Sequence, residues 1–177
     1  GKVRYFALSN EWPWGLMEFI RLAKIKNLPL VCTLQNSYSL INRIVELGMT
    51  EIFFREKLSF FSYSPLGFGH LSGKYLKDPK AAGRVNLFPG YAQRYNKSGV
   101  EKAIEKYDAL AAKRNMNLTD LALSFVYSQW FVTSTVIGAT NMNQLKQNIA
   151  AYGLDIVDEE LIQEIDAIHL DVMNPAP

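Results

Sequence analysis

Hydrophobic residues recur along the chain in two patterns. Short apolar runs rich in strand-forming residues predict β-strands at residues 3–9, 30–35, 58–63 and 131–137. Apolar residues at helical spacing predict helices at residues 14–26, 43–54, 100–114, 118–130, 143–151 and 158–170. Gly48 weakens the second helix, Thr119 is the expected N-cap of the fourth, and Asp158, followed by two glutamates, suits the start of the last.

Strands that alternate with helices indicate a parallel sheet with right-handed crossovers. Four strands in a chain of 177 residues fit two α/β architectures. One is a small doubly wound four-strand sheet with a complete monomeric core. The other is half of a (β/α)8 barrel, since a whole barrel takes about 250 residues. The pattern by itself leaves both open.

A long irregular stretch at residues 64–98 interrupts this alternation, with glycine, proline, lysine and arginine throughout. Loops of that length in a compact domain are usually functional or disordered.

Composition narrows the class of protein. Hydrophobic residues make up 49% of the chain and charged residues 20%, which is typical of a soluble globular domain. The net charge of +2 is too small to indicate a nucleic-acid or membrane partner. The single cysteine, Cys32, is expected to be a small buried core residue, and its lack of a partner favours the reducing cytoplasm. No membrane span or secretory leader is expected, and a chain that starts with Gly need not begin where its gene begins.

Small or polar residues follow each predicted strand. They are Ser9 and Asn10, Gln35 and Asn36, Tyr63 and Ser64, and residues 138–140. Parallel α/β folds bind ligands at the edge where the carboxyl ends of the strands meet. Polar ends on all four strands favour a ligand site at that edge.

These residue types suit a nucleotide. Ser, Asn and Gln hydrogen-bond an amide or a ribose, and Tyr63 can stack on a flat ring. The loop after Tyr63 holds three glycines and Lys74, which would bring backbone N–H groups and a positive charge to phosphate. Gly138 precedes a predicted helix start, which also attracts phosphate.

Each group also has a structural alternative. Asn10 and Asn36 can serve as caps or turn residues, Tyr63 can belong to the core, and the glycines can only shape turns. The spacing alone does not decide between the two readings.

Four segments, in order, resemble motifs of the aldo-keto reductase family. GKVRYFALSN resembles G-K-hydrophobic-R-x-hydrophobic-G-hydrophobic-S-N, and LQNSYSLINR resembles Q-N-x-Y-[ST]-hydrophobic-hydrophobic-x-R. YSPLGFGHLSGKY resembles Y-[ST]-P-L-x-x-G-x-L-[ST]-G-K-Y, and VIGATNMNQLKQNI resembles hydrophobic-x-G-[AT]-[ST]-x-x-x-Q-L-x-x-N. The resemblance covers nearly the whole chain and is nearest to the bacterial Tas-like subgroup.

The resemblance implies a (β/α)8 TIM barrel in which residues 1–177 form the C-terminal, cofactor-binding half with strands five to eight. It also implies that NADP(H) binds at the carboxyl ends of the strands. The nicotinamide carboxamide would be bound by Ser9, Asn10 and Gln35, and Tyr63 would stack on the nicotinamide ring. The pyrophosphate would be lined by Ser64, Leu66, Gly67 and Gly69, with Lys74 and Arg84 near the phosphates. The adenosine end would be held by Gly138, Thr140, Gln144, Gln147 and Asn148.

Three positions depart from the family pattern. Ala7 stands where a glycine is usual, which is expected to be harmless, and the other two bear on the cofactor. Many members carry Arg at the position of Gln144, where it binds the 2′-phosphate, and an acid at the position of Gln147. The sequence therefore leaves the choice between NADP(H) and NAD(H) open.

The family's catalytic Asp, Tyr, Lys and His lie on the first four strands, before the part that this chain resembles. No catalytic residue and no metal site are therefore expected within residues 1–177. The two histidines, His70 and His169, match no catalytic position and are expected to be solvated or structural.

The resemblance implies an NADP(H)-dependent reductase of small aldehydes or ketones. The alternatives are a non-catalytic nicotinamide-nucleotide-binding or regulatory half-barrel, and an inactive truncated remnant. A half-barrel would have two open edge strands and a bare inner face. We therefore expect it to self-associate or to pair with a missing N-terminal half.

Overall fold

The computed structural model describes residues 2–88 and 90–177, and it contains one four-stranded parallel sheet. The strands are β1 (Phe6–Ser9), β2 (Val31–Ser37), β3 (Ser59–Tyr63) and β4 (Ser134–Val136), and they lie side by side in chain order. A doubly wound sheet reverses its strand order at a switch point, and this sheet does not. The fold is thus α/β with barrel-type winding in a sheet that does not close, which matches the partial barrel expected from the sequence.

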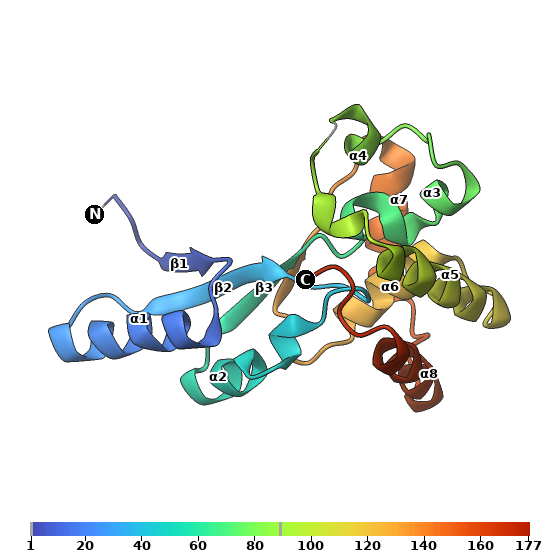
Figure 1. Ribbon diagram of the computed structural model, residues 1–177. Coiled ribbons are helices and arrows are strands. Elements are labelled where there is room, and N and C mark those ends of the chain that lie inside the picture. Colours follow the sequence, from blue (N-terminus) through green and yellow to red (C-terminus); the bar gives the residue numbers. More distant parts are fainter. Residues whose placement is uncertain (1, 89) are drawn as a thin grey trace.

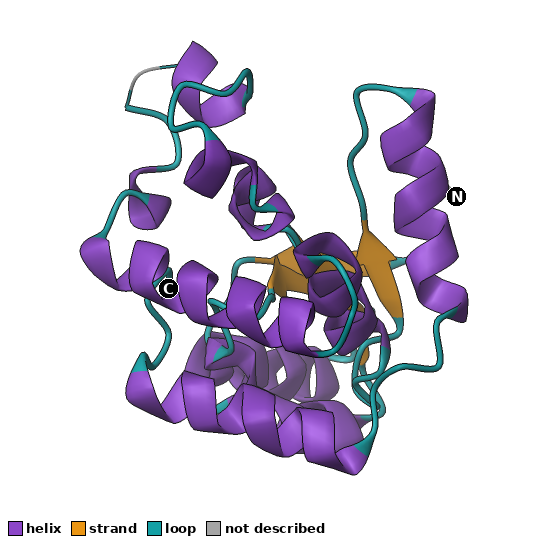
Figure 2. Cartoon of the chain, turned by 90° about the vertical axis from the view of Figure 1, so that its right-hand side faces the viewer, coloured by secondary structure: helices purple, strands orange, loops and turns teal. Residues whose placement is uncertain are grey.

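The helices follow the expected alternation. They are α1 (Pro13–Lys26), α2 (Met49–Glu56), α3 (Lys74–Lys77), α4 (Arg84–Leu87), α5 (Ser98–Lys113), α6 (Leu118–Tyr127), α7 (Met142–Ala150) and α8 (Glu159–Asp171), with the short 3₁₀ turns η1 (Ile44–Glu46), η2 (Gly67–Ser72), η3 (Gln93–Tyr95) and η4 (Ala151–Gly153). In Figure 1, α1 and α2 lie along the sheet, and the remaining helices gather on the side toward which the arrows of β1 and β2 point. Seen from that side, these helices stand in front of the strands (Figure 2). The described residues include no helix long and apolar enough to cross a membrane.

Several predicted bounds were wrong. The helix expected over residues 43–54 is divided into η1 and α2, because Gly48 takes a positive φ of 96° between them. The first and last strands are shorter than their apolar runs. The N-cap of α6 is Asn117 instead of Thr119, and its side chain accepts a hydrogen bond from the N–H of Asp120. The expected cap at Asp158 is confirmed, since its carboxylate accepts from the N–H of Leu161 at 2.7 Å.

One face of the sheet packs against the helices. Leu34 and Phe60 are neighbours across β2 and β3 and are fully buried. Tyr38 and the rings of α2 and α6 surround them, with Phe53 stacked on Phe60 at 5.0 Å. Cys32 is only partly buried, and its thiol donates to the carbonyl oxygen of Phe6 at 3.1 Å, so the prediction of a buried core cysteine was wrong.

Among residues 2–88 and 90–177, no helix covers the opposite face of the sheet. Ser9, Gln35, Phe61 and Ser134 form one register row across all four strands, and none of them is buried. Side chains alternate between the two faces of a strand, so this row faces away from the core. Within the described residues β1 pairs only with β2 and β4 only with β3, which leaves two open edges as expected for a half-barrel.

The C-terminal segment returns to the carboxyl edge of the sheet, where Figure 1 places the C-terminus. The side chain of Asn174 accepts from the N–H of Arg43 at 2.6 Å, and the N–H of Ala176 donates to the carbonyl oxygen of Ile41 at 3.1 Å. These bonds tie the end of the chain to the loop that follows β2.

Candidate functional site

The predicted nicotinamide contacts meet at the ends of β1, β2 and β3. Ser9 and Gln35 are direct neighbours in register, two residues before the pair of Ser37 and Tyr63. The hydroxyl of Tyr63 crosses the end of β2 and donates to Oδ1 of Asn10 at 2.7 Å, and Nδ2 of Asn10 donates to the hydroxyl of Ser9 at 3.2 Å. Hydrogen bonds therefore join Ser9, Asn10 and Tyr63 at the carboxyl edge of the sheet, and Gln35 lies beside Ser9 in register; whether they bind a cofactor stays a prediction.

Two residues at this edge have left-handed backbones. Asn10 directly follows β1 with φ 57°, and Ser64 directly follows β3 with φ 55°. A non-glycine residue in this region costs about 1–2 kcal/mol, and such residues cluster at binding and catalytic sites. The backbone is therefore specialised at two of the positions that the sequence assigned to the cofactor.

The loop after β3 is shaped by its glycines. Gly67 has φ 51°, and a Cβ there would lie 2.9 Å from Cδ1 of Ile41 and 3.4 Å from the ring of Tyr95, so a larger residue would strain the backbone and displace the side chain of Ile41. Its N–H donates to the carbonyl oxygen of Ser64, and the N–H of Gly69 donates to that of Leu66, both at 2.9 Å. In this conformation both N–H groups are used within the turn, which favours the structural alternative for these two glycines.

The loop also presents two cations held over aromatic rings. Nζ of Lys74 lies 4.8 Å from the ring centre of Tyr75 and donates to the carbonyl oxygen of Ala82 at 3.0 Å. The guanidinium of Arg84 lies 5.5 Å from the ring centre of Phe68. Stacking of this kind restrains long side chains that would otherwise be mobile. The two cations are thus held on one loop, as a site for a polyanion requires.

A cluster of rings beneath these cations holds three buried polar atoms. They are Nε2 of His70 and the hydroxyls of Tyr75 and Tyr95, and none has a hydrogen-bond partner among residues 2–88 and 90–177. His70 stacks on Tyr95 at 5.4 Å. Burial and the charge of Lys74 lower the pKa of His70 to about 4, so its ring is neutral near pH 7. His70 is therefore packed among aromatic rings, and its structural role stays a prediction.

The residues predicted to hold adenosine lie around the start of α7. Oε1 of Gln144 accepts from the N–H and the hydroxyl of Thr140 at 2.8 and 3.0 Å. Nδ2 of Asn148, which is buried, donates to the carbonyl oxygen of Gly138 at 3.1 Å. Thr140 and Gln144 are exposed, whereas Asn148 supports the backbone of the loop that carries them.

The first turn of α6 connects the adenosine group with the loop after β3. Nε2 of Gln147 donates to Asn117 and Asp120, both at 3.1 Å. Gly73, at the end of η2, lies against the same turn, since a Cβ there would come within 3.9 Å of Leu118. Asn117 and Asp120 were not predicted as site residues. Only the capping pattern of the helix start points to them in the sequence.

Asn36 is a further residue that sequence reasoning did not assign to the site. Its Oδ1 accepts from the N–H of Glu11 at 3.2 Å, and its Nδ2 donates to the carbonyl oxygen of Glu11 at 2.8 Å. It therefore secures the loop between β1 and α1. Gln35 and Asn36, the polar pair at the end of the predicted strand, are the sequence signal that could have indicated this role, and the structure places both within β2.

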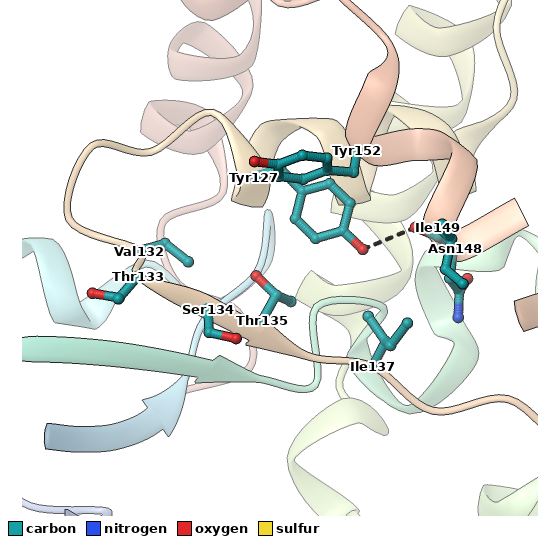
Figure 3. Close-up of a pocket in the computed structure, with 9 residues that line it drawn as sticks. All are labelled: Tyr127, Val132, Thr133, Ser134, Thr135, Ile137, Asn148, Ile149 and Tyr152. Atoms are coloured by element: carbon teal, nitrogen blue, oxygen red, sulfur yellow. Dashed lines mark hydrogen bonds between the residues drawn. The ribbon is translucent and has the colours of Figure 1, made fainter.

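A groove of about 330 Å³ follows the open edge of β4 (Figure 3). Its walls come from β4, from Tyr127 on α6 and from Asn148, Ile149 and Tyr152 on α7 and η4. The hydroxyl of Tyr127 donates to the backbone carbonyl of Asn148 at 3.0 Å, and the ring of Tyr152 packs edge-on against it. The groove is thus an exposed, largely apolar surface beside the open edge of β4.

Comparison with known proteins gives one consistent result. The sequence profile described as "Aldo/keto reductase family" matches residues 1–169. "Protein tas" of Escherichia coli (strain K12) is 41% identical over 177 residues, which cover 100% of this chain and 51% of that protein. An "Aldo-keto reductase" of Babesia bovis is 38% identical over 99% of this chain and 64% of that protein, and "L-glyceraldehyde 3-phosphate reductase" of Escherichia coli (strain K12) is 27% identical over 92% and 49%.

The chain spans about half the length of most of these curated relatives. This share agrees with the half-barrel that the sheet displays. The profile match covers far more than half of the chain, and the four sequence motifs lie within it. The chain belongs to the aldo/keto reductase family.

Proposed function

We propose that residues 1–177 form the C-terminal, cofactor-binding half of an NADP(H)-dependent aldo-keto reductase that reduces a small aldehyde or ketone. The observation that carries this proposal is the convergence of Ser9, Asn10, Gln35 and Tyr63 at the carboxyl ends of three neighbouring strands. Ligands of parallel α/β folds bind at this edge.

The residues present fit a nicotinamide nucleotide. Gln35 and Ser9 offer an amide and a hydroxyl on the inner face, the groups that pair with a carboxamide. Tyr63 offers a half-exposed ring held by its bond to Asn10. Lys74 and Arg84 would neutralise the pyrophosphate, and exposed Thr140 and Gln144 would contact the adenosine end.

When bound, NADPH supplies a hydride to the carbonyl carbon. The part of this chain is to hold the nicotinamide through Ser9, Asn10 and Gln35 and to cover one ring face with Tyr63. The proton for the carbonyl oxygen would come from the family's catalytic tyrosine, which the resemblance assigns to an earlier strand than any of these. No catalytic residue is assigned within residues 1–177.

The cofactor preference belongs to the same proposal. Gln144, where many relatives carry Arg, is neutral, and its oxygen is already engaged by Thr140. The side chain therefore offers no cation to a 2′-phosphate. We expect use of NADPH with only a modest advantage over NADH, which the ratio of kcat/KM for the two cofactors measures.

The experiment that tests the proposal is a cofactor titration of the protein as its own cell produces it. NADPH should raise the Tm of the wild type. The Kd for NADPH should rise about tenfold in Lys74→Ala or Arg84→Ala, since each substitution removes a charge-assisted contact to phosphate. Lys80→Ala is the matched control, because Lys80 is an exposed cation of the same loop whose side chain makes no described contact. The Lys80→Ala variant should bind NADPH with the same Kd as the wild type.

Three outcomes separate the candidate functions. Binding with carbonyl-dependent oxidation of NADPH supports the reductase. Binding without turnover across a panel of aldehydes and ketones supports the non-catalytic nucleotide-binding alternative. A protein whose Tm does not respond to millimolar NADPH or NADH contradicts both and leaves the inactive remnant.

We also propose that the open edges of the sheet bind the remaining half of the barrel. The groove along β4 lies at one edge, and a second groove of about 640 Å³ lies beside β1, between residues 3–6, α1 and the start of β2. Tyr5 and Phe6 line the second groove and are exposed. Apolar grooves beside the open edges at both ends of one sheet suit a partner that adds a strand to each edge.

A further inference from the structure

We propose that Asn36 is a positioning residue for nicotinamide binding and that it acts through Glu11 on Asn10. The inference rests on the proposed function, because it concerns how the predicted carboxamide ligand Asn10 is held. Asn36 itself lies on β2 beside Gln35, on the opposite face of the strand.

The starting point is the backbone of Asn10. Its N–H donates to the carbonyl oxygen of Gln35 at 3.0 Å, which extends the pairing of β1 with β2 by one residue. The chain then turns with φ 57° and leaves the sheet. A left-handed backbone of this kind persists only where its surroundings hold it from both sides.

Asn36 holds the far side of this turn. Glu11 lies beyond the paired part of β1, where its backbone forms no hydrogen bond with the backbone of β2. The side chain of Asn36 provides the hydrogen bonds that a paired strand would otherwise provide. Its Oδ1 accepts from the N–H of Glu11 at 3.2 Å and its Nδ2 donates to the carbonyl oxygen of Glu11 at 2.8 Å. With the bond from Asn10 to Gln35, three hydrogen bonds hold two consecutive residues to β2.

The geometry suits a short amide side chain. The amide group carries a donor and an acceptor on one short side chain, whereas Asp has no donor and Ser has a single hydroxyl. Both amide atoms of Asn36 are used on one peptide, so they copy the pattern of a strand partner. A change at Asn36 therefore frees Glu11 without removing any predicted cofactor ligand.

The consequence reaches the site through Asn10. Its Oδ1 accepts the hydroxyl of Tyr63 at 2.7 Å, and its Nδ2 lies on the hydroxyl of Ser9. If Glu11 is freed, Asn10 can relax to an ordinary φ, and its side chain then turns away from Tyr63 and Ser9. The carboxamide ligand and the stacking ring would lose their common support.

The test combines a cofactor-free and a cofactor-dependent measurement on the whole protein as its cell makes it. In Asn36→Ala, backbone amide hydrogen exchange at residues 10–12 should become faster without any cofactor. The Kd for NADPH should rise about tenfold in the wild-type background but less than twofold in Asn10→Ala, because two residues that act as a unit are not additive. Asn36→Asp keeps the hydrogen-bond acceptor and loses the donor, so its Kd for NADPH should lie between those of the wild type and Asn36→Ala. This variant replaces Asn36→Ala in the test if the alanine variant does not fold.

The matched control is Asn174→Ala. It removes one hydrogen bond from an asparagine side chain to a loop backbone, at Arg43, away from the predicted cofactor contacts. It should lower Tm and leave the Kd for NADPH unchanged. A merely structural Asn36 would behave in the same way.

The results that overturn the inference are distinct from those that overturn the proposed function. Two results would show that the positioning role is wrong while the cofactor site stands. In the first, Asn36→Ala binds NADPH as tightly as the wild type does. In the second, the substitution raises the Kd for NADPH by the same factor in the wild-type and the Asn10→Ala backgrounds. Unchanged exchange at residues 10–12 overturns it as well. If the wild type binds neither NADPH nor NADH, the proposed function fails, and Asn36 then has no nicotinamide to position.

Discussion

Two buried tyrosines, Tyr107 and Tyr95, differ in whether their hydroxyl groups form a hydrogen bond. The hydroxyl of Tyr107 is buried and donates to the carbonyl oxygen of Leu40 at 3.2 Å. Tyr95, only 2% exposed, has a hydroxyl near Ser37 and Ser64 that forms no hydrogen bond with any described residue. Burial raises the pKa of Tyr95, so the hydroxyl stays neutral. Two buried tyrosines of similar packing thus differ in one hydrogen bond.

This difference gives a prediction at the residue scale. Tyr107→Phe should lower the free energy of unfolding by about 1–2 kcal/mol, because it leaves a buried carbonyl unpaired. Tyr95→Phe should leave it unchanged or raise it by about 1 kcal/mol, because it removes a buried hydroxyl without breaking a bond. Denaturant unfolding of both variants measures the pair. An equal loss in both would mean that the Tyr95 hydroxyl is satisfied in solution.

At the scale of elements, Arg43 joins three parts of the chain. Its guanidinium binds Glu46 on η1 and Asp166 on α8, each at 2.7 Å, and lies over the ring of Phe125 on α6 at 5.2 Å. The N–H of Arg43 also donates to Asn174 in the C-terminal segment. The side chain of Arg43 is 11% exposed, so solvent screens these contacts weakly. The arginine of the motif LQNSYSLINR therefore has a structural role here.

Removing the guanidinium of Arg43 should destabilise the protein more than breaking an exposed ion pair does. Arg43→Gln should lower the free energy of unfolding by about 2 kcal/mol, because it leaves the partly buried carboxylate of Glu46 without its cation, whereas Asp166 is exposed enough for solvent to compensate it. Arg55→Gln, which breaks a pair with Glu51 whose side chains are 71% and 64% exposed, should change it by less than about 0.5 kcal/mol. The same denaturant series checks both, and similar losses would refute the argument from burial.

At the scale of the whole molecule, the sheet is incomplete on two sides and one face. β1 and β4 are open edges among the described residues, and the row from Ser9 to Ser134 has no covering layer. Among residues 2–88 and 90–177, the exposed large apolar residues include Phe6 at the β1 edge and Val136 on β4, and exposed apolar surface beside an open edge favours association. The proposed pairing with a second half-barrel would cover these edges.

Residues 1–177 expressed alone should therefore associate. Analytical ultracentrifugation should give a mass above 20.1 kDa, the mass of one chain. Val136→Lys, which places a charge on the open strand β4, should shift the mass toward the single chain. Leu170→Lys is the matched control, since it adds the same charge to an exposed position on α8. A monodisperse, cooperatively melting single chain would contradict the open-edge argument.

The local pattern of residues determined the elements and the edge at which the polar strand ends meet. Alternating strand and helix periods gave four strands and the parallel architecture, and Asp158 identified the start of α8, because these signals depend only on neighbours in sequence. The resemblance of four motifs to the aldo-keto reductases gave the family. Whether the predicted cofactor residues bind NADP(H) stays a prediction.

Only the tertiary structure decided which polar groups satisfy one another. Asn36 meets Glu11 across 25 residues, Tyr63 meets Asn10 across 53, and Gln147 meets Asn117 across 30. The N–H groups of Gly67 and Gly69 proved to be used within their own turn. Such pairings follow from strand register and from the packing of helices, which join distant segments. No local period of the sequence carries that information, because hydrogen-bond partners are selected by position in space.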